Sequence, residues 1–328
     1  MVAQVARGDP VFAAAALDGL QRYQQAPRSQ ERWPGVPGEA IGRAGLHCYR
    51  ADGPPVLLVP SVINPPFVLD MARNNSLAKA LVDAGFAVHL LTWGTPAPAD
   101  RDEGLAAHVE RYLLPAIERL GSDVQLVGHC LGGTLALGAG AVGKVASVAT
   151  IASPWDFDAY SGAMRVRLAR LWEHNRRALD IGGLVPLELL QTAFWALDPE
   201  RIVHKFARLA DPALTPKAFA NFVALEDWAN GGAPLPYAAG ADLFEVMFGA
   251  NATAKGEWRI AGKPISLRPD HVPSLHFAST SDRIVPLASV PDWGERREVA
   301  SGHIGMVVGR SAPDTLWRPL IDWLGGHA

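Results

Sequence analysis

Residues 124–133 read Val-Gln-Leu-Val-Gly-His-Cys-Leu-Gly-Gly, and this stretch decides the fold that the sequence predicts. An apolar run typical of a buried strand leads into a Gly-x-Cys-x-Gly turn, and an alanine- and glycine-rich segment follows. Glycine at positions 128 and 132 leaves room for a sharp, strained turn from strand to helix. The pattern therefore predicts a nucleophile elbow that presents Cys130 at a helix N-terminus, where the helix dipole and free backbone N–H groups favour a thiolate and an adjacent oxyanion.

The bulk composition indicates an ordinary globular protein. The chain has 328 residues, of which 49% are hydrophobic, and a formal net charge of −3, which gives no reason to expect nucleic-acid binding. Its two cysteines, Cys48 and Cys130, exclude a disulfide framework and suit a reducing cytosol. The first apolar run, residues 11–17, is a poor signal peptide, and no run approaches the ~20 residues that span a membrane. We therefore expect a cytoplasmic protein without a membrane span.

Strand and helix patterns alternate on both sides of the elbow. Several strand candidates are continuous apolar runs, as in parallel strands covered on both faces. The candidates are residues 46–49, 56–59, 87–92, 124–127, 145–151, 274–278 and 297–300. Helical patterns fall at residues 11–23, 76–84, 105–120, 130–142 and 314–324. This order predicts an α/β protein with a mostly parallel central sheet, which with the elbow indicates the α/β-hydrolase fold.

The alternation stops between the elbow-side strands and the late strand. Residues 155–270 read as helices and loops rich in aromatic side chains, and we interpret them as a helical cap inserted above the carboxyl ends of the strands. The expected organisation is a peripheral N-terminal segment (1–45), a first part of the core (46–154), the cap (155–270) and a second part of the core (271–328).

A base and an orienting acid follow the elbow in the order that this fold uses. Asp282 comes just after the apolar strand 274–278, and His303 lies between glycines after the last strand. We expect His303 to take the proton of Cys130 and Asp282 to fix the imidazole tautomer. The Leu131 N–H is one expected oxyanion donor and the Ile63 N–H, in the loop after strand 56–59, the second. The histidines show no metal-ligand spacing, so no metal is expected.

The motif set resembles the polyhydroxyalkanoate synthases, in particular their short form. The resemblance covers roughly residues 40–325 and consists of an ordered series of motifs, namely residues 57–64, 91–94, 128–133, 152–157, 282–286 and 301–305. The family's catalytic cysteine, aspartate and histidine match Cys130, Asp282 and His303. The resemblance implies an acyltransferase that moves 3-hydroxyacyl groups from CoA thioesters, through a cysteine acyl-enzyme, to a growing polyester and releases free CoA.

Several questions stay open at the level of sequence. The same residues would serve a hydrolase, either a polyester depolymerase, an esterase or a thioesterase, and a third alternative is a non-catalytic granule-associated protein. Either His303 or Asp282 could activate the attacking hydroxyl. No cofactor is expected besides the CoA thioester substrate. The resemblance implies a hydroxyacyl-CoA and a polyester chain as partners, leaves open a homodimer or a second synthase subunit, and suggests association with polyester granules.

Overall fold

The computed structural model describes residues 5–28, 36–195, 199–211, 213–266 and 272–328. Within the described residues the chain forms two compact units. The larger comprises Arg32–Leu187 and Gly232–Ala328, and the smaller comprises Met1–Glu31 and Glu188–Gly231. The segment 155–270, expected as a cap, thus contributes to both units. Its expected end at residues 270 and 271 lies outside the described residues.

The larger unit is built on an eight-stranded sheet in the order β1-β2-β6-β3-β7-β8-β13-β14. Strands β1 and β2 pair antiparallel with each other, as do β2 and β6, and the other neighbours pair in parallel. The strands are β1 (Val36–Ile41), β2 (Ala44–Cys48), β3 (Pro55–Val59), β6 (Ala87–Thr92), β7 (Gln125–His129), β8 (Ser147–Ile151), β13 (Ser274–Ser279) and β14 (Glu295–Val299).

The central parallel strands form because their side chains are apolar on both faces and can be covered by helices on both sides, whereas the parallel edge strand β14 has only Val299 buried. Every residue of β7, β8 and β13 is buried, as are four of the five in β3. The expected α/β architecture with a mostly parallel sheet is confirmed. The sequence pattern does not predict β1, because Pro37, Gly38 and Glu39 are poor strand formers. This edge strand exists by pairing with β2, for example Ala40 with Gly45.

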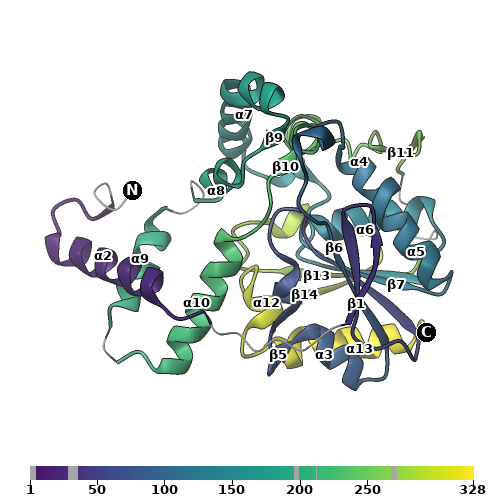
Figure 1. Cartoon of the computed structure of the whole chain (residues 1–328), viewed down its shortest axis with the longest axis horizontal. Coiled ribbons are helices and arrows are strands. Elements are labelled where there is room, and N and C mark those ends of the chain that lie inside the picture. Colours follow the sequence, from purple (N-terminus) through teal and green to yellow (C-terminus); the bar gives the residue numbers. More distant parts are fainter. Residues whose placement is uncertain (1–4, 29–35, 196–198, 212, 267–271) are drawn as a thin grey trace. The chain divides into compact units, whose positions relative to one another are not determined.

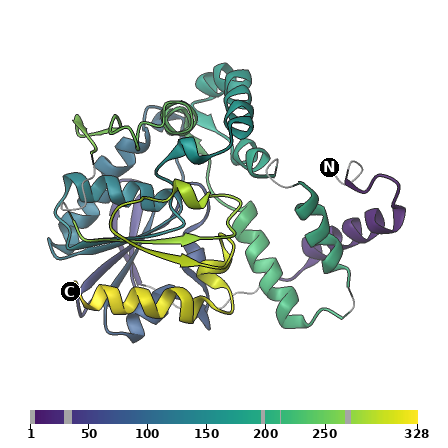
Figure 2. The same ribbon diagram turned by 180° about the vertical axis from the view of Figure 1, so that it is seen from behind.

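Helices cover the sheet in two layers, with α3 and α13 on one face and α4, α5 and α6 on the other (Figures 1 and 2). Ser76 caps α3 by accepting a hydrogen bond from the Lys79 N–H at 2.9 Å, a role for which serine is well suited. The elements of these layers are α3 (Leu77–Asp83), α4 (Leu105–His108), η3 (Val109–Leu113), α5 (Leu114–Leu120), α6 (Leu131–Val142), α12 (Gly305–Val308), η7 (Pro313–Trp317) and α13 (Arg318–Gly325).

Further elements of the larger unit lie in the loops between these strands and helices. Before the elbow lie η1 (Pro66–Leu69), β4 (Asp70–Ala72), β5 (Asn75–Ser76) and η2 (Pro98–Asp100). After β8 lie η4 (Phe157–Ala159), α7 (Gly162–Gly182), β9 (Leu184–Val185), β10 (Leu235–Pro236), α11 (Tyr237–Ala241), η5 (Asp242–Met247), β11 (Arg259–Ile260), β12 (Lys263–Pro264) and η6 (Leu287–Ser289). The Trp172 ring of α7 stacks on Phe244 and Tyr237, which holds α7 against α11 and η5.

The smaller unit is helical and has its own aromatic core. It contains α2 (Pro10–Gln25), α9 (Pro199–Leu209) and α10 (Pro216–Asn230), together with all but the first residue of α8 (Leu187–Trp195). Tyr23, Phe206 and Phe222 pack their rings against one another with centroids 5.7–6.5 Å apart. Asp227 accepts a hydrogen bond from the Tyr23 hydroxyl at 2.8 Å, so α2 and α10 are also held by a polar contact.

Candidate active site

Cys130 occupies the turn between β7 and α6 with strained backbone angles, φ 54° and ψ −131°. A non-glycine residue tolerates such a conformation only where the surroundings enforce it. Here α6 packs so closely on β3 that a Cβ at Gly132 would lie 2.3 Å from the carbonyl oxygens of Val59 and Pro60. Glycine at position 132 is therefore a steric requirement, and the turn that the sequence predicts presents the Cys130 side chain beyond the carboxyl end of the sheet.

Asp282 and His303 form a buried acid–base pair. His303 Nδ1 donates a hydrogen bond to Asp282 Oδ2 at 2.7 Å, and the side chains are 5% and 1% exposed. The other oxygen of the carboxylate, Oδ1, accepts the N–H groups of Ile284 at 2.7 Å and Val285 at 3.1 Å. The carboxylate is thus held by the turn that follows it in sequence, and it in turn orients the imidazole.

Neighbouring strands bring these two residues together. Ser279, the last residue of β13, pairs with Val299, the last residue of β14. Beyond the strands, the Thr280 N–H donates to the Val299 carbonyl at 3.1 Å, and the Ser279 hydroxyl donates to the Ser301 carbonyl. Since parallel strands end at one edge of the sheet, these bonds fix the loops of Asp282 and His303 side by side.

Charge and hydrogen bonding link the pair to Cys130. Burial alone would lower the pKa of His303, but the negative charges of Asp282 and Cys130, with hydrogen bonds to both, raise it to about 10. Burial would raise the pKa of Asp282, but the charge of His303 and the bonds that the carboxylate accepts hold it below its usual value. The three residues named by the sequence pattern therefore lie together, with His303 as an imidazolium near neutral pH.

Two further buried rings border this group. The His129 ring lies 5.3 Å from that of His303, centroid to centroid, and burial together with the charge of His303 lowers the pKa of His129 to about 3. Burial, then the charges of Cys130 and Asp282, raise the pKa of Tyr160 well above its usual value. Both groups stay neutral beside the ionised pair. Sequence reasoning missed Tyr160, whose one signal is its place in the segment that follows β8.

The two expected oxyanion donors differ in their surroundings. The Leu131 N–H belongs to the first turn of α6, where backbone N–H groups have no acceptor within the helix. Ile63 lies in the buried loop after β3, and its N–H donates to the Ser61 hydroxyl at 3.3 Å. This long bond within the loop orients the Ile63 N–H and is weak enough to be exchanged for a bond to a charged oxygen.

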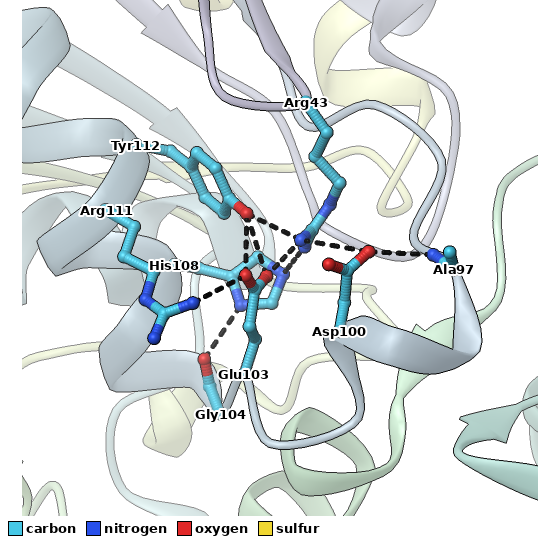
Figure 3. A network of polar contacts seen from close by, with 8 residues as sticks. All are labelled: Arg43, Ala97, Asp100, Glu103, Gly104, His108, Arg111 and Tyr112. Atoms are coloured by element: carbon cyan, nitrogen blue, oxygen red, sulfur yellow. Dashed lines mark hydrogen bonds and ion pairs between the residues drawn. The ribbon is translucent and has the colours of Figure 1, made fainter.

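A buried polar network supports the base of this loop. The Trp93 indole N–H donates to the Pro60 carbonyl at 3.0 Å, and the ring packs edge-on against His108 with centroids 5.7 Å apart. His108 Nδ1 donates to the Gly104 carbonyl at 2.8 Å, while Nε2 accepts from Arg43 at 3.0 Å (Figure 3). Burial lowers the pKa of His108 to about 4, so this ring stays neutral.

Glu103 is the centre of the same network. Its carboxylate receives the Arg43 guanidinium, the Arg111 guanidinium at 2.9 Å and the Tyr112 hydroxyl at 2.8 Å (Figure 3). Burial would raise the pKa of Glu103, but the hydrogen bonds from Arg43 and Tyr112 outweigh it and lower the pKa. The network therefore ties the β1–β2 turn to α4 and η3, close to the tryptophan that holds the Pro60 carbonyl.

The described residues contain no group of three or more His, Cys, Asp or Glu side chains that could hold a metal ion. None of the helices in the described ranges is both long and apolar enough to cross a lipid bilayer.

Comparison with known proteins gives relatives over most of the chain. No family model matches it. The poly(3-hydroxyalkanoate) polymerase subunit PhaC of Haloferax mediterranei is 29% identical over 285 residues, which cover 82% of this chain and 58% of that protein. The subunit of Allochromatium vinosum is 27% identical over 308 residues, covering 85% of each chain. The chain is thus similar in sequence to proteins named as poly(3-hydroxyalkanoate) polymerase subunits. It spans 58% and 60% of the polymerase subunits of Haloferax mediterranei and Haloarcula marismortui.

Solved structures share the fold of this chain. The α/β-hydrolase GrgF from a Penicillium species superposes with a TM-score of 0.54 at 17% identity, covering 92% of this chain and 99% of that one. A monoacylglycerol lipase of Paleococcus ferrophilus gives a TM-score of 0.53 at 19% identity, covering 86% and 99%. The expected α/β-hydrolase fold is confirmed.

Proposed function

We propose that the protein is a polyhydroxyalkanoate synthase-type acyltransferase that moves 3-hydroxyacyl groups from CoA thioesters through Cys130 to a growing polyester. The observation that carries the proposal is the close association of Cys130, His303 and Asp282 at the carboxyl edge of the sheet. The relationship to proteins named as poly(3-hydroxyalkanoate) polymerase subunits supports the choice of substrate.

Acylation starts at Cys130, which is hydrogen-bonded to His303. The Cys130 sulfur attacks the thioester carbonyl, and the carbonyl oxygen becomes an oxyanion stabilised by the N–H groups of Leu131 and Ile63. The tetrahedral intermediate collapses, the bond to the CoA sulfur breaks, and the CoA thiolate takes the proton of His303. The new thioester on Cys130 is close in energy to the one consumed, so the acyl group stays activated.

Chain extension requires a base for the 3-hydroxyl that attacks the acyl-enzyme, and the geometry favours His303 over Asp282. Asp282 is 1% exposed, and its oxygens already accept bonds from His303, Ile284 and Val285. Neutral after CoA release, His303 accepts the hydroxyl proton while the hydroxyl oxygen attacks the thioester. The ester forms, and the imidazolium and the Cys130 thiolate are regenerated.

We extend the proposal to the setting of the reaction. No cofactor is required, because the CoA thioester is itself the substrate. The relatives' designation as polymerase subunits supports a second synthase subunit as partner. The growing polyester implies that the protein acts in the cytoplasm at the surface of a polyester granule.

The test is incubation of the purified protein with 3-hydroxybutyryl-CoA, in parallel with Cys130→Ala. A thiol reagent follows CoA release, and mass spectrometry identifies the acyl product. We expect CoA release with ester-linked oligomers, both abolished in Cys130→Ala. Release of CoA with free hydroxy acid alone would establish a thioesterase instead, and equal activity of Cys130→Ala would exclude the proposed acyl-enzyme.

A further inference from the structure

The backbone around Gly232 contacts the oxyanion loop directly. Gly232 has a φ of +136°, a region that side chains with a Cβ rarely adopt. A Cβ at this position would lie 2.2 Å from the Ile63 carbonyl oxygen and 3.3 Å from Leu187 Cδ1. Glycine is thus required here for two reasons, the backbone conformation and the closeness of Ile63.

A short ribbon holds Gly232 in this position. Strands β9 and β10 pair antiparallel, with Val185 opposite Leu235 and Leu184 opposite Pro236. Val185 and Leu235 are buried, and the Tyr237 N–H donates to the Gly183 carbonyl at 3.0 Å. The larger unit is interrupted in sequence between Leu187 and Gly232. The pairing of β9 with β10 joins the chain on both sides of this interruption, and Leu187 and Gly232 lie beside Ile63.

Residue 63 is consequently constrained on both sides. Its N–H is oriented by the Ser61 hydroxyl, and its carbonyl is packed against Gly232. The Ile63 carbonyl and N–H belong to adjacent peptide planes joined at one Cα, so a forced shift of the carbonyl changes the φ and ψ angles that also set the direction of the N–H. Since an oxyanion donor acts only when it lies close to the position that the charge will occupy, such a shift reduces its effect.

We propose that Gly232 is a positioning residue for acyl transfer, setting the Ile63 N–H for the oxyanion through its backbone contact with the Ile63 carbonyl. This proposal rests on the oxyanion role of Ile63 in the proposed function. Gly232 touches neither substrate nor the reacting atoms in this account and acts through Ile63. A substitution there should slow attack on a carbonyl, which creates an oxyanion, and spare reactions of Cys130 that create none.

The experiment compares Gly232→Ala with Gly182→Ala, whose added Cβ meets no atom within 4 Å. Two reactions of Cys130 are measured on each protein, acylation by 3-hydroxybutyryl-CoA or 4-nitrophenyl acetate, and alkylation by iodoacetamide. In Gly232→Ala we expect kcat for acylation to fall about tenfold or more, up to the roughly 10²–10³-fold that complete loss of an oxyanion donor costs. KM and the alkylation rate should change less than about twofold, as should every rate of Gly182→Ala.

Acylation by Gly232→Ala at the wild-type rate would overturn the proposal, and so would an equal fall of acylation and alkylation. If Gly232→Ala does not fold, Leu187→Ala tests the same contact, because it removes a side chain that lies beside both Gly232 and the Ile63 carbonyl. It should slow acylation several-fold without affecting alkylation, and unchanged acylation would overturn the proposal. Reaction of the wild type with the nitrophenyl ester but not the CoA thioester would reject the proposed substrate while leaving Gly232 testable.

Discussion

At the residue scale, the Asp282 carboxylate is engaged on both oxygens before any substrate arrives. Asp282→Asn keeps the size of the side chain but removes the charge that raises the pKa of His303. We expect the pKa of His303 to fall by at least about 1 unit and kcat for acylation to fall about 10³-fold or more. NMR titration of the His303 ring and single-turnover acylation measure the two effects.

Asp292→Asn is the matched control for that substitution, since Asp292 lies exposed in the same loop after β13. It should leave both the titration and the rate unchanged. An unchanged His303 titration in Asp282→Asn would contradict the role of the carboxylate.

At the scale of elements, the contact between α6 and the end of β3 leaves no space for a side chain at position 132. Gly132→Ala would push a Cβ against the carbonyls of Val59 and Pro60. We expect the free energy of unfolding to fall by about 2 kcal/mol or more, measured by urea denaturation. Gly325→Ala, at the end of α13 with no atom within 4 Å of the added Cβ, is the control. Equal urea midpoints for Gly132→Ala and Gly325→Ala would show that the elbow does not require glycine at position 132.

The network around Glu103 is a second contact between elements. Glu103→Gln leaves the Arg43 guanidinium, whose side chain is 13% exposed, without its buried carboxylate partner. Loss of one partner of a buried ion pair costs about 3 kcal/mol, so we expect a clear drop in the urea midpoint. Asp83→Asn breaks the exposed pair with Lys79 and should cost at most about 0.5 kcal/mol. Similar midpoints for Glu103→Gln and Asp83→Asn would show that the network contributes little.

At the scale of the whole molecule, buried histidines determine how stability depends on pH. The folded-state pKa values of His108, His129 and His276 are about 4, 3 and 4, below the ordinary 6.5. The unfolded chain therefore binds more protons as pH falls below 6.5, and stability is lost. His303 acts in the opposite direction, because its folded-state value of about 10 lies above 6.5. Its contribution is complete below pH 6.5 and is lost as pH rises toward 10.

We accordingly expect the free energy of unfolding to be largest near neutral pH and to decrease toward both acidic and alkaline pH. Urea denaturation at a series of pH values between 4 and 10 measures it. The alkaline decline should be smaller in Asp282→Asn, since that variant lacks the charge that raises the pKa of His303. If the free energy of unfolding of the wild type stays constant from pH 7 to pH 10, the raised folded-state pKa of His303 is wrong.

The sequence was informative wherever a local pattern reflects a three-dimensional requirement. The apolar runs predicted β3, β6, β7, β8 and β13, because parallel strands are buried on both faces. The elbow follows β7 and the Asp282 loop follows β13, so their positions at one edge of the sheet could be foreseen. The His303 loop follows β14, an edge strand in which only Val299 is buried, and its place was inferred from the order of the residues in this fold.

What the sequence could not predict depends on contacts between distant residues. Arg43 and Glu103 meet only because β1 and β2 form an antiparallel edge, and β1 itself has little strand propensity. The contact of Gly232 with Ile63 arises from the pairing of two-residue strands too short to have a periodic pattern. Tyr160 likewise becomes part of the site through packing, since no motif marks a tyrosine at that position.

The order of the strands also bears on how the protein is made. The nucleophile elbow follows β7 in the middle of the sheet, whereas Asp282 and His303 follow β13 and β14, the last strands to be translated. A nascent chain that has folded through α6 carries the cysteine without its imidazole. In the proposed mechanism, Cys130 therefore gains its imidazole only after His303 has been translated and β14 has paired with β13, so a chain that stops before His303 would lack the proposed acyl transfer.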